Sequence, residues 1–313
     1  MHMGCLLLFL VSCVPAFAQQ FTIPVFPDTQ SEVGDRHEMF YSQIDWIVAN
    51  RDSLNMPMAL HVGDLVNFDN HDHWEVAIRG FDTFDRNFVP YAIALGNHDG
   101  EAVGRYSGSA APGNVNQNLR KTSKFNNYFP VSRFRSQRGR YEADKSDNAY
   151  YTFKVGNTNW LVVSLEFCPR MGAINWAGDV VQQYDDYNVI LLTHYYLTPR
   201  GEIAERNAGY GDFSPAMVYD KLVKVYPNIR FVLSGHVMAT ALKVDEREDG
   251  SKVYQLLQNY QNEDHGGGYL RLLNFDIDKG TVEAVMYSPF YDKVRTDDSR
   301  YVLEGVDFLK IRK

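Results

Sequence analysis

The sequence repeatedly places a short apolar run directly before a polar signature, and this pattern constrains the fold more than any other feature. Stretches with the helical spacing of apolar residues, such as 37–54 and 173–184, lie between the runs. In α/β sheets, ligands bind at the carboxyl ends of strands. The pattern therefore predicts strands whose ends bring the polar signatures together. The signatures are Asp28-Thr29-Gln30, Gly63-Asp64, Gly96-Asn97-His98-Asp99, Thr193-His194 and Ser234-Gly235-His236.

The rest of the sequence completes a mixed α/β architecture. Residues 100–147 are rich in Gly, Ser, Asn and Arg and form a long irregular region, which inside a compact domain is usually functional or disordered. Residues 238–287 alternate between apolar and polar side chains, as successive antiparallel strands do. Alternating strands and helices followed by a strand-rich end predict two packed sheets with helices outside.

The residue types in the signatures indicate a metal site. Asp, Asn and His supply the oxygen and imidazole donors that suit Zn, Mn, Fe or Ni. Glycines stand beside Asp64, Asn97 and His236, where they let the backbone turn tightly. We therefore expect a divalent transition-metal ion as cofactor.

The first residues predict export. An apolar run at residues 6–11 and the small-x-small pattern Ala16-Phe17-Ala18 favour signal cleavage after Ala18, which leaves 19–313 as one domain. The segment Leu10–Cys13 also resembles a bacterial lipobox, so a secreted or periplasmic protein and a lipoprotein anchored through Cys13 both remain open. No later stretch approaches the roughly 18 apolar residues of a membrane span.

Charge and motif content exclude several function classes. Lys and Arg number 31 against 39 Asp and Glu, a net charge of −8. The chain has no dense basic block of the kind that neutralises nucleic-acid phosphates. It also has neither the G-x-S-x-G elbow of serine hydrolases nor a P-loop.

The order of the five signatures resembles the calcineurin-like metallophosphoesterase superfamily, whose pattern is D-x-H, G-D, G-N-H-[DE], H and G-H-x-H. The resemblance implies a four-layer α/β/β/α sandwich of two mixed sheets flanked by helices. It implies hydrolysis of a phosphodiester or phosphomonoester, in a small molecule or a polymer, by a metal-activated water. The implied roles are a first-metal ligand for Asp28, a bridging ligand for Asp64, second-metal ligands for Asn97, His194 and His236, and a catalytic role for His98 oriented by Asp99.

Two positions depart from that pattern. Gln30 replaces the histidine of D-x-H, and Met238 replaces the second histidine of G-H-x-H. An amide oxygen is a weaker donor than imidazole, and a thioether is poorly matched to these metals. We therefore expect one tight metal and a weaker second one that uses Gln30. Asp69 or His71 could supply a replacement ligand.

A non-catalytic metal- or ligand-binding protein with a degraded first site is the alternative function. The pair His98 and Asp99 favours catalysis, because a pure binder has no need for a proton donor there. The sequence also resembles a secreted bacterial branch of the superfamily at Pro27–Gln30 and Ser234–Val237, and further at Leu165-Glu166-Phe167 and Asn259-Tyr260-Gln261. Arg170 and Arg200, just beyond strand ends, are candidate phosphate clamps.

Overall fold

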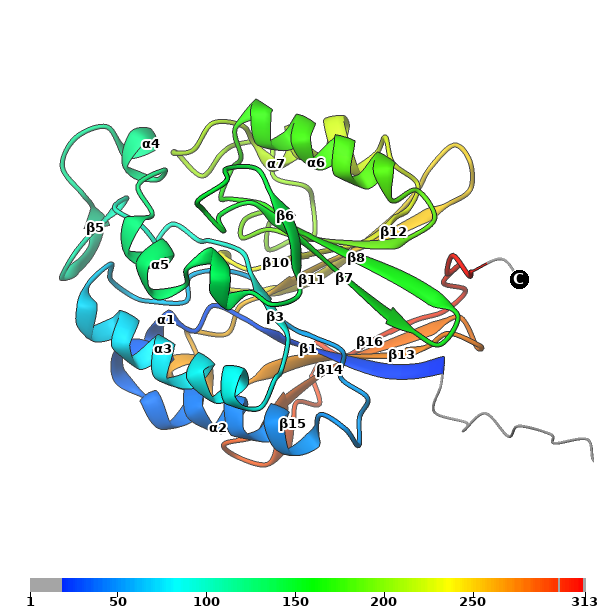
Figure 1. The fold of residues 1–313 in the computed structure, drawn as a ribbon, viewed down its shortest axis with the longest axis horizontal. Helices are drawn as coiled ribbons and strands as arrows, with labels where there is room; N and C mark the ends of the chain where they lie inside the picture. The colour runs from blue at the N-terminus through cyan, green and yellow to red at the C-terminus, as the bar shows by residue number, and fades with distance from the viewer. Residues whose placement is uncertain (1–18, 298, 312–313) are drawn as a thin grey trace, which may run out of the picture.

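Two seven-stranded sheets face each other at the centre of the protein, in a computed structural model that describes residues 19–297 and 299–311 (Figure 1). Helices cover the outer face of each sheet, so the chain forms the predicted four-layer α/β/β/α sandwich. The expected signal segment 1–18, with Cys13, lies outside the described residues. Within the described ranges, no helix is long and apolar enough to cross a membrane.

The first sheet has the order β15-β14-β13-β1-β2-β3, with β16 paired to β14. β1, β2 and β3 run parallel, whereas β13 is antiparallel to β1 and β14 is antiparallel to β13. The strands are β1 (Gln20–Phe26), β2 (Ala59–His61), β3 (Tyr91–Ile93), β13 (Leu270–Asp276), β14 (Thr281–Ser288), β15 (Lys293–Val294) and β16 (Tyr301–Leu303).

The second sheet has the order β11-β12-β10-β9-β8-β7-β6. Its centre, from β12 through β10 and β9 to β8, is parallel, and antiparallel strands complete both edges. The strands are β6 (Gln137–Arg140), β7 (Ala149–Val155), β8 (Thr158–Ser164), β9 (Asn188–Leu192), β10 (Ile229–Ser234), β11 (Thr240–Glu246) and β12 (Lys252–Gln258).

The helices divide between the two outer faces. α1 (Gln30–Asp35), α2 (His37–Asn50) and α3 (His71–Arg86) lie beside the first sheet, and α6 (Met171–Gln183) and α7 (Pro215–Val218) beside the second (Figure 1). The π-helical turn η3 (Tyr219–Val223) continues α7. The helical segment at 215–223 is therefore an α-helical turn followed by a π-helical one. The six-residue helix α1 was not predicted, since it is too short to show a period.

Strand β8 shows how the alternation of side chains builds the layers. Trp160 faces the first sheet, and its ring lies 5.3 Å from that of Phe21 in an edge-to-face contact. Leu161 and Val163 point the other way and pack with Ala177 of α6. Both faces of the strand are thus buried, which explains why it reads as a continuous apolar run.

The long region at residues 100–147 forms several short helices and strands. It contains β4 (Val103–Gly104), β5 (Ser107–Ala110), α4 (Val115–Asn118), α5 (Ser123–Tyr128) and η2 (Val131–Arg133). Phe125 of α5 is buried and packs against Trp74 of α3, with ring centroids 5.9 Å apart. This contact ties the region to the first helical layer.

The strand-rich end of the chain is shared between the sheets. β11 and β12 extend the second sheet, whereas β13 and β14 pair with β1 in the first. The 3-10 turn η4 (Asp264–Gly266) lies in the connection between β12 and β13. The predicted alternation is present, but periodicity contains no information about which sheet each strand joins.

Candidate metal centre

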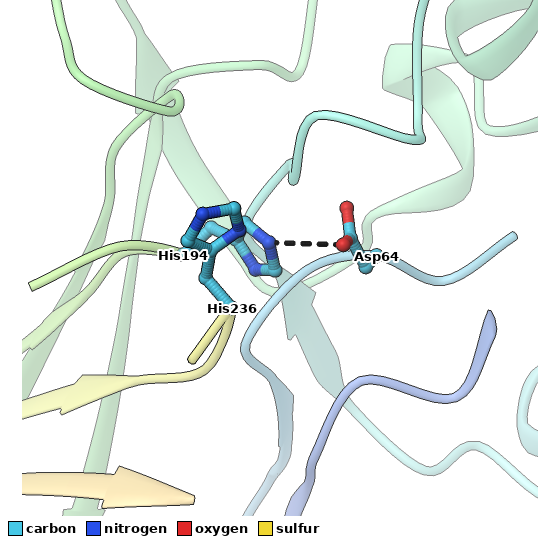
Figure 2. Close-up of side chains that lie close together, drawn as sticks. All are labelled: Asp64, His194 and His236. Atoms are coloured by element: carbon cyan, nitrogen blue, oxygen red, sulfur yellow. Dashed lines mark ion pairs between the residues drawn. The ribbon is translucent and has the colours of Figure 1, made fainter. Parts of the chain in front are cut away.

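The polar signatures follow strands whose carboxyl ends meet. Asp28, Asp64 and residues 96–99 follow the parallel strands β1, β2 and β3 of the first sheet. His194 and His236 follow the parallel strands β9 and β10 of the second. Asp64, His194 and His236 each offer a donor atom, and these atoms lie within 4.8 Å of one another (Figure 2). The two sheets therefore supply one cluster together.

Hydrogen bonding orients His194 within this cluster. Its Nδ1 atom lies 2.9 Å from the carbonyl oxygen of Val62, which can only accept, so Nδ1 carries a hydrogen and donates it. Nε2 lies 3.1 Å from Oδ2 of Asp64. A backbone carbonyl that fixes one ring nitrogen is typical of histidines that bind a metal through the other. His194 thus presents Nε2 to Asp64.

Two buried acceptors in this region fit a cation. Oδ1 of Asn97 has no hydrogen-bond partner among the described residues, and Nε2 of His194 faces only the carboxylate of Asp64, at 3.1 Å. Leaving a buried polar atom without a partner costs about 1–3 kcal/mol. A carboxylate, an amide oxygen and imidazoles are together suited to Zn, Mn, Fe or Ni. The donors around Asp64 therefore fit a divalent transition-metal ion.

The electrostatics of the cluster depend on a carboxylate facing imidazoles. Burial by itself raises the pKa of Asp64, but His194, His98 and His236 outweigh it and hold that pKa below its usual range. Burial also opposes charge on His194, yet the carboxylates of Asp64 and Asp28 raise its pKa to about 9. Burial and the neighbouring His194 lower the pKa of His236 to about 3. Because metals and protons compete for the same donor atoms, a cation would replace the proton between Asp64 and His194.

Two of the glycines beside the signatures let the backbone close around the carboxylates. A Cβ atom on Gly96 would lie 2.0 Å from Oδ1 of Asp64, and one on Gly235 would lie 2.0 Å from Oδ1 of Asp28. Both separations are far inside ordinary contact distance. Side chains at these positions would push the turns away from the site.

His98 is held next to Asp64, but not in the way the family pattern implies. Its backbone N–H donates to Oδ1 of Asp64 at 2.9 Å, and its Nδ1 donates to the carbonyl oxygen of Asn67 at 2.6 Å. The fully buried carboxylate of Asp99 accepts the backbone N–H groups of Val66 and Gly96 instead. The prediction that Asp99 orients the His98 ring is therefore wrong.

The physical reason is the burial of Asp99. Its carboxylate is cut off from water, and the two backbone donors are the groups that compensate it. Burial, followed by the charge of Asp64, raises the pKa of Asp99 to about 7. Asp99 thus joins the loop after β3 to the loop after β2, and a backbone carbonyl orients the His98 ring.

Asp28 and Gln30 belong to a hydrogen-bond network of backbone and side-chain amides, beside the Asp64 cluster. Both oxygens of Asp28 accept the backbone N–H of His236, at 3.1 and 3.0 Å, and Oδ2 also accepts Nδ2 of Asn259 at 2.6 Å. The side-chain amide of Gln30 donates to Oε1 of Gln261 at 2.6 Å. Oε1 of Gln30 is buried and has no hydrogen-bond partner within the described part of the chain.

The residues suggested as replacements for the histidine that Met238 displaces already have partners. Met238 is 53% exposed. The carboxylate of Asp69 pairs with Lys124 at 2.8 Å, and Nδ1 of His71 lies 2.8 Å from the hydroxyl of Tyr128. Both groups are therefore engaged in other contacts.

The candidate phosphate clamps are neutralised by carboxylates. Arg170 pairs with Glu142 and Glu166, each at 2.8 Å, and Arg200 pairs with Glu202 at 3.1 Å. Arg170 thus already has two carboxylate partners, whereas the Arg200–Glu202 pair is exposed to solvent.

Two supporting residues were not assigned these roles from the sequence. The buried ring of Phe167 packs against both metal-site imidazoles, with centroids 5.7 Å from His194 and 5.2 Å from His236. His61 is buried and accepts the backbone N–H of Gly63 at Nδ1, which supports the turn before Asp64. His61 ends β2, so its place at a strand end was a usable signal.

Comparisons with known proteins concern the family and the fold of the chain. The family model for calcineurin-like phosphoesterases matches residues 32–239. The uncharacterized protein YvnB of Bacillus subtilis (strain 168) is 31% identical over 302 residues, which cover 92% of this chain and 21% of that protein. The chain thus spans about a fifth of the length of this relative.

Solved structures share the fold at low sequence identity. A purple acid phosphatase from yellow lupin (Lupinus luteus) seeds superposes with a TM-score of 0.56 at 12% identity, covering 91% of this chain and 54% of that one. A dimetal phosphatase from Danio rerio gives a TM-score of 0.53 at 10% identity, covering 91% of this chain and 98% of that one.

Proposed function

We propose that this chain, which belongs to the calcineurin-like phosphoesterase family, is a metal-dependent hydrolase of phosphoesters. The observation that carries the proposal is the convergence of Asp64, His194 and His236, with donor atoms within 4.8 Å of one another, beside His98. The two sheets meet at this point, and the residues that suit a cation and a proton donor meet there with them.

The tight metal position would use Asp64, Asn97, His194 and His236. When bound, a divalent ion such as Mn, Fe, Zn or Ni lowers the pKa of a bound water toward neutrality and neutralises phosphoryl charge. The Val62 carbonyl orients His194 so that its Nε2 atom faces this position. The family pattern would place a second, weaker position at Asp28, Gln30 and the shared Asp64, where it finds fewer strong donors.

His98 would be the catalytic side chain. Because Nδ1 donates to the Asn67 carbonyl, Nε2 is the nitrogen left to face substrate. From there it can give a proton to the departing alkoxide or stabilise charge on the phosphoryl group. Asp99 contributes by fixing the loop that carries His98.

Several wider features belong to the same proposal. Residues 19–313 would form one catalytic domain, exported by the segment 1–18 or anchored through Cys13. The substrate would be a phosphodiester or a phosphomonoester in a small molecule or a polymer.

A non-catalytic metal- or ligand-binding role is the second candidate. The observation in its favour is the departure from the family pattern at Gln30 and Met238. The placement of His98 against Asp64 favours catalysis, because binding alone requires no free imidazole nitrogen there.

The test is hydrolysis of an aryl phosphodiester and of the matching monoester by the purified full chain. The protein is first stripped with a chelator, and Mn, Fe, Zn or Ni is then restored. We expect turnover of at least one ester only after metal is added, and none from a metal-loaded Asp64→Asn variant. Tight metal binding without turnover of any phosphoester would instead support the binding role.

A further inference from the structure

The backbone of His236 is held in an unusual conformation. Its φ angle is +65°, in the left-handed region that is unfavourable for a non-glycine residue. Such a conformation persists only where its surroundings enforce it. Here the N–H donates to Asp28, and the carbonyl oxygen accepts Nδ2 of Asn259 at 3.2 Å. Both polar groups of this backbone unit are therefore bound by the same two side chains.

The orientation of Asn259 is settled by three contacts. Its Oδ1 accepts the backbone N–H of Gln261 at 3.0 Å. Its Nδ2 donates to the carbonyl of His236 and to Oδ2 of Asp28, the latter at 2.6 Å. A flipped amide would put its oxygen against two other oxygens and its NH2 group against an N–H. Asn259 therefore presents hydrogen-bond donors, not an acceptor, to Asp28.

Two N–H donors already bind the Asp28 carboxylate, which a cation would also need. The side chain is 1% exposed, and both oxygens already accept hydrogen bonds. The backbone of Gly235 lies so close to Oδ1 that a Cβ there would be 2.0 Å away. A cation in the first position would have to compete with the amide of Asn259 for the same carboxylate.

We propose that Asp28 and Asn259 form a clamp on the backbone of His236, in the place where the family pattern has its first metal. The protein then binds a single metal ion, on the Asp64 side, and Asp28 acts as a positioning residue for His236 instead of as a ligand. This inference rests on the proposed function only for the identity of the remaining metal site.

Gln30 extends the same network. Its NH2 group donates to the side chain of Gln261, whose backbone N–H donates to Asn259. A histidine in place of Gln30 would have no carbonyl oxygen and NH2 group side by side. The replacement of the family histidine by glutamine thus matches a network of amides in this place.

The experiment measures metal stoichiometry and Kd without reference to activity. Chelator-treated full chain is dialysed against Zn²⁺ alone or Mn²⁺ alone, followed by elemental analysis and titration calorimetry. We expect one equivalent in the parent. Asp28→Asn and Asn259→Ala should each still bind one equivalent, with a Kd raised about 10–100-fold, as is typical when a group that orients a ligand is lost.

The matched control is Asn188→Ala. Asn188 is a fully buried amide at the opposite end of β9 from His194, and it bonds the backbone of Asn159 and Leu309. Its loss costs stability without touching the site, so the metal Kd should stay within about twofold of the parent, well short of the 10–100-fold change expected for the clamp. Circular dichroism confirms that each variant is folded before it is titrated.

Each outcome decides something. Two equivalents in the parent, falling to one in Asp28→Asn, would overturn the clamp and leave the proposed function intact. One equivalent with an unchanged Kd in Asp28→Asn and Asn259→Ala would also overturn the clamp. One equivalent with the expected Kd changes, but no phosphoester turnover, would overturn the proposed function and leave the clamp standing. A parent that binds no metal would overturn both.

Discussion

Asp64 and Asp28 are both buried carboxylates at the end of a parallel strand of the first sheet, but their partners differ in kind. Asp64 faces the ring nitrogen of His194, and Asn97 on the adjoining turn carries a buried acceptor that no other described residue pairs with. Asp28 faces N–H groups, from the backbone of His236 and the amide of Asn259. A cation requires lone pairs, and Asp64 meets them on His194 and Asn97, whereas among the described residues around Asp28 the buried Oε1 of Gln30 is the one atom of this kind that has no partner.

The charges around the two carboxylates differ in the same sense. Three imidazoles outweigh burial at Asp64 and hold its pKa below the usual range. At Asp28, burial dominates and Asp64 adds repulsion, so its pKa is raised well above the usual range despite the attraction of His194. Two aspartates with the same sequence signature, at the end of an apolar run, thus have opposite electrostatic surroundings.

Removing a donor on the Asp64 side should have the largest effect. His194→Ala and His236→Ala each delete an imidazole, and we expect metal affinity to fall by more than about 100-fold, beyond the range for indirect partners. Metal-dependent hydrolysis should be lost with the metal. Elemental analysis after dialysis measures the retained ion.

The comparison within this prediction is Gln30→Ala. In the part of the chain that the structure describes, Oε1 of Gln30 is buried and has no partner, but Gln30 lies in the amide network of Asp28, so this variant should keep its tight metal. Equal metal loss in all three variants would show that the two sides of the centre do not differ. If His194→Ala fails to fold, His236→Ala provides the measurement, because His236 is less buried than His194.

His98→Ala should have the next largest effect, on rate alone. Loss of a general acid or base typically costs about 10²–10⁴-fold in rate, and metal content should be unchanged because His98 is not a donor in the cluster. Steady-state kinetics on an activated aryl phosphodiester measure the loss. Exposed His37, at the start of α2, provides the control His37→Ala, which should match the parent.

A His98→Ala protein with full metal-dependent activity would remove His98 from the mechanism. A variant that lost metal and rate together would make His98 a ligand instead. Asp99→Asn replaces the carboxylate that joins the loop after β2 to the loop after β3. It should lower stability through the contacts with Val66 and Gly96, since Asp99 does not contact the His98 ring.

Much of the fold could be predicted because burial enforces it on the sequence. Strands such as β8 and β10 are covered on both faces, so they appear as apolar runs with recognisable ends. The pairing of strands is harder to predict from the sequence. The alternating segments at β12 and β13 look alike, yet one extends the second sheet and the other pairs with β1 in the first. Side-chain periodicity specifies which face is buried, but it does not specify the neighbouring strand.

The candidate site was predictable as a set of donors but not as a set of contacts. Which residues end strands can be read from the sequence, so His194 and Asp64 were both expected near a metal. Which atom bonds which depends on turns of a few residues. The Asp99 carboxylate accepts backbone N–H groups, and the side-chain amide of Asn259 donates to Asp28. Asn259 itself follows the buried strand β12, so the signal that marked the other strand ends was available for it.

Met238→His should have the smallest effect, and it tests the Asp28 side directly. From the family pattern alone, restoring this imidazole would strengthen a second metal position. In the structure Met238 is 53% exposed, and Asp28 is already bonded to Asn259. An added imidazole has no carboxylate free to share a cation with, so we expect one equivalent of Zn²⁺ or Mn²⁺ and a Kd within about twofold of the parent, far less than the 10–100-fold change from losing a positioning group.

Val244→His provides the matched control for that measurement. Val244 is 44% exposed on β11. The substitution therefore adds an imidazole of similar exposure, but away from the strand ends that carry the metal-site residues. Both variants should bind alike in calorimetry. If Met238→His gained a second equivalent and Val244→His did not, the first position would be able to hold a metal with only one ligand restored. The difference between the Asp64 and Asp28 sides would then lie in a single missing imidazole, and the amide of Asn259 would be displaced whenever a cation competes with it.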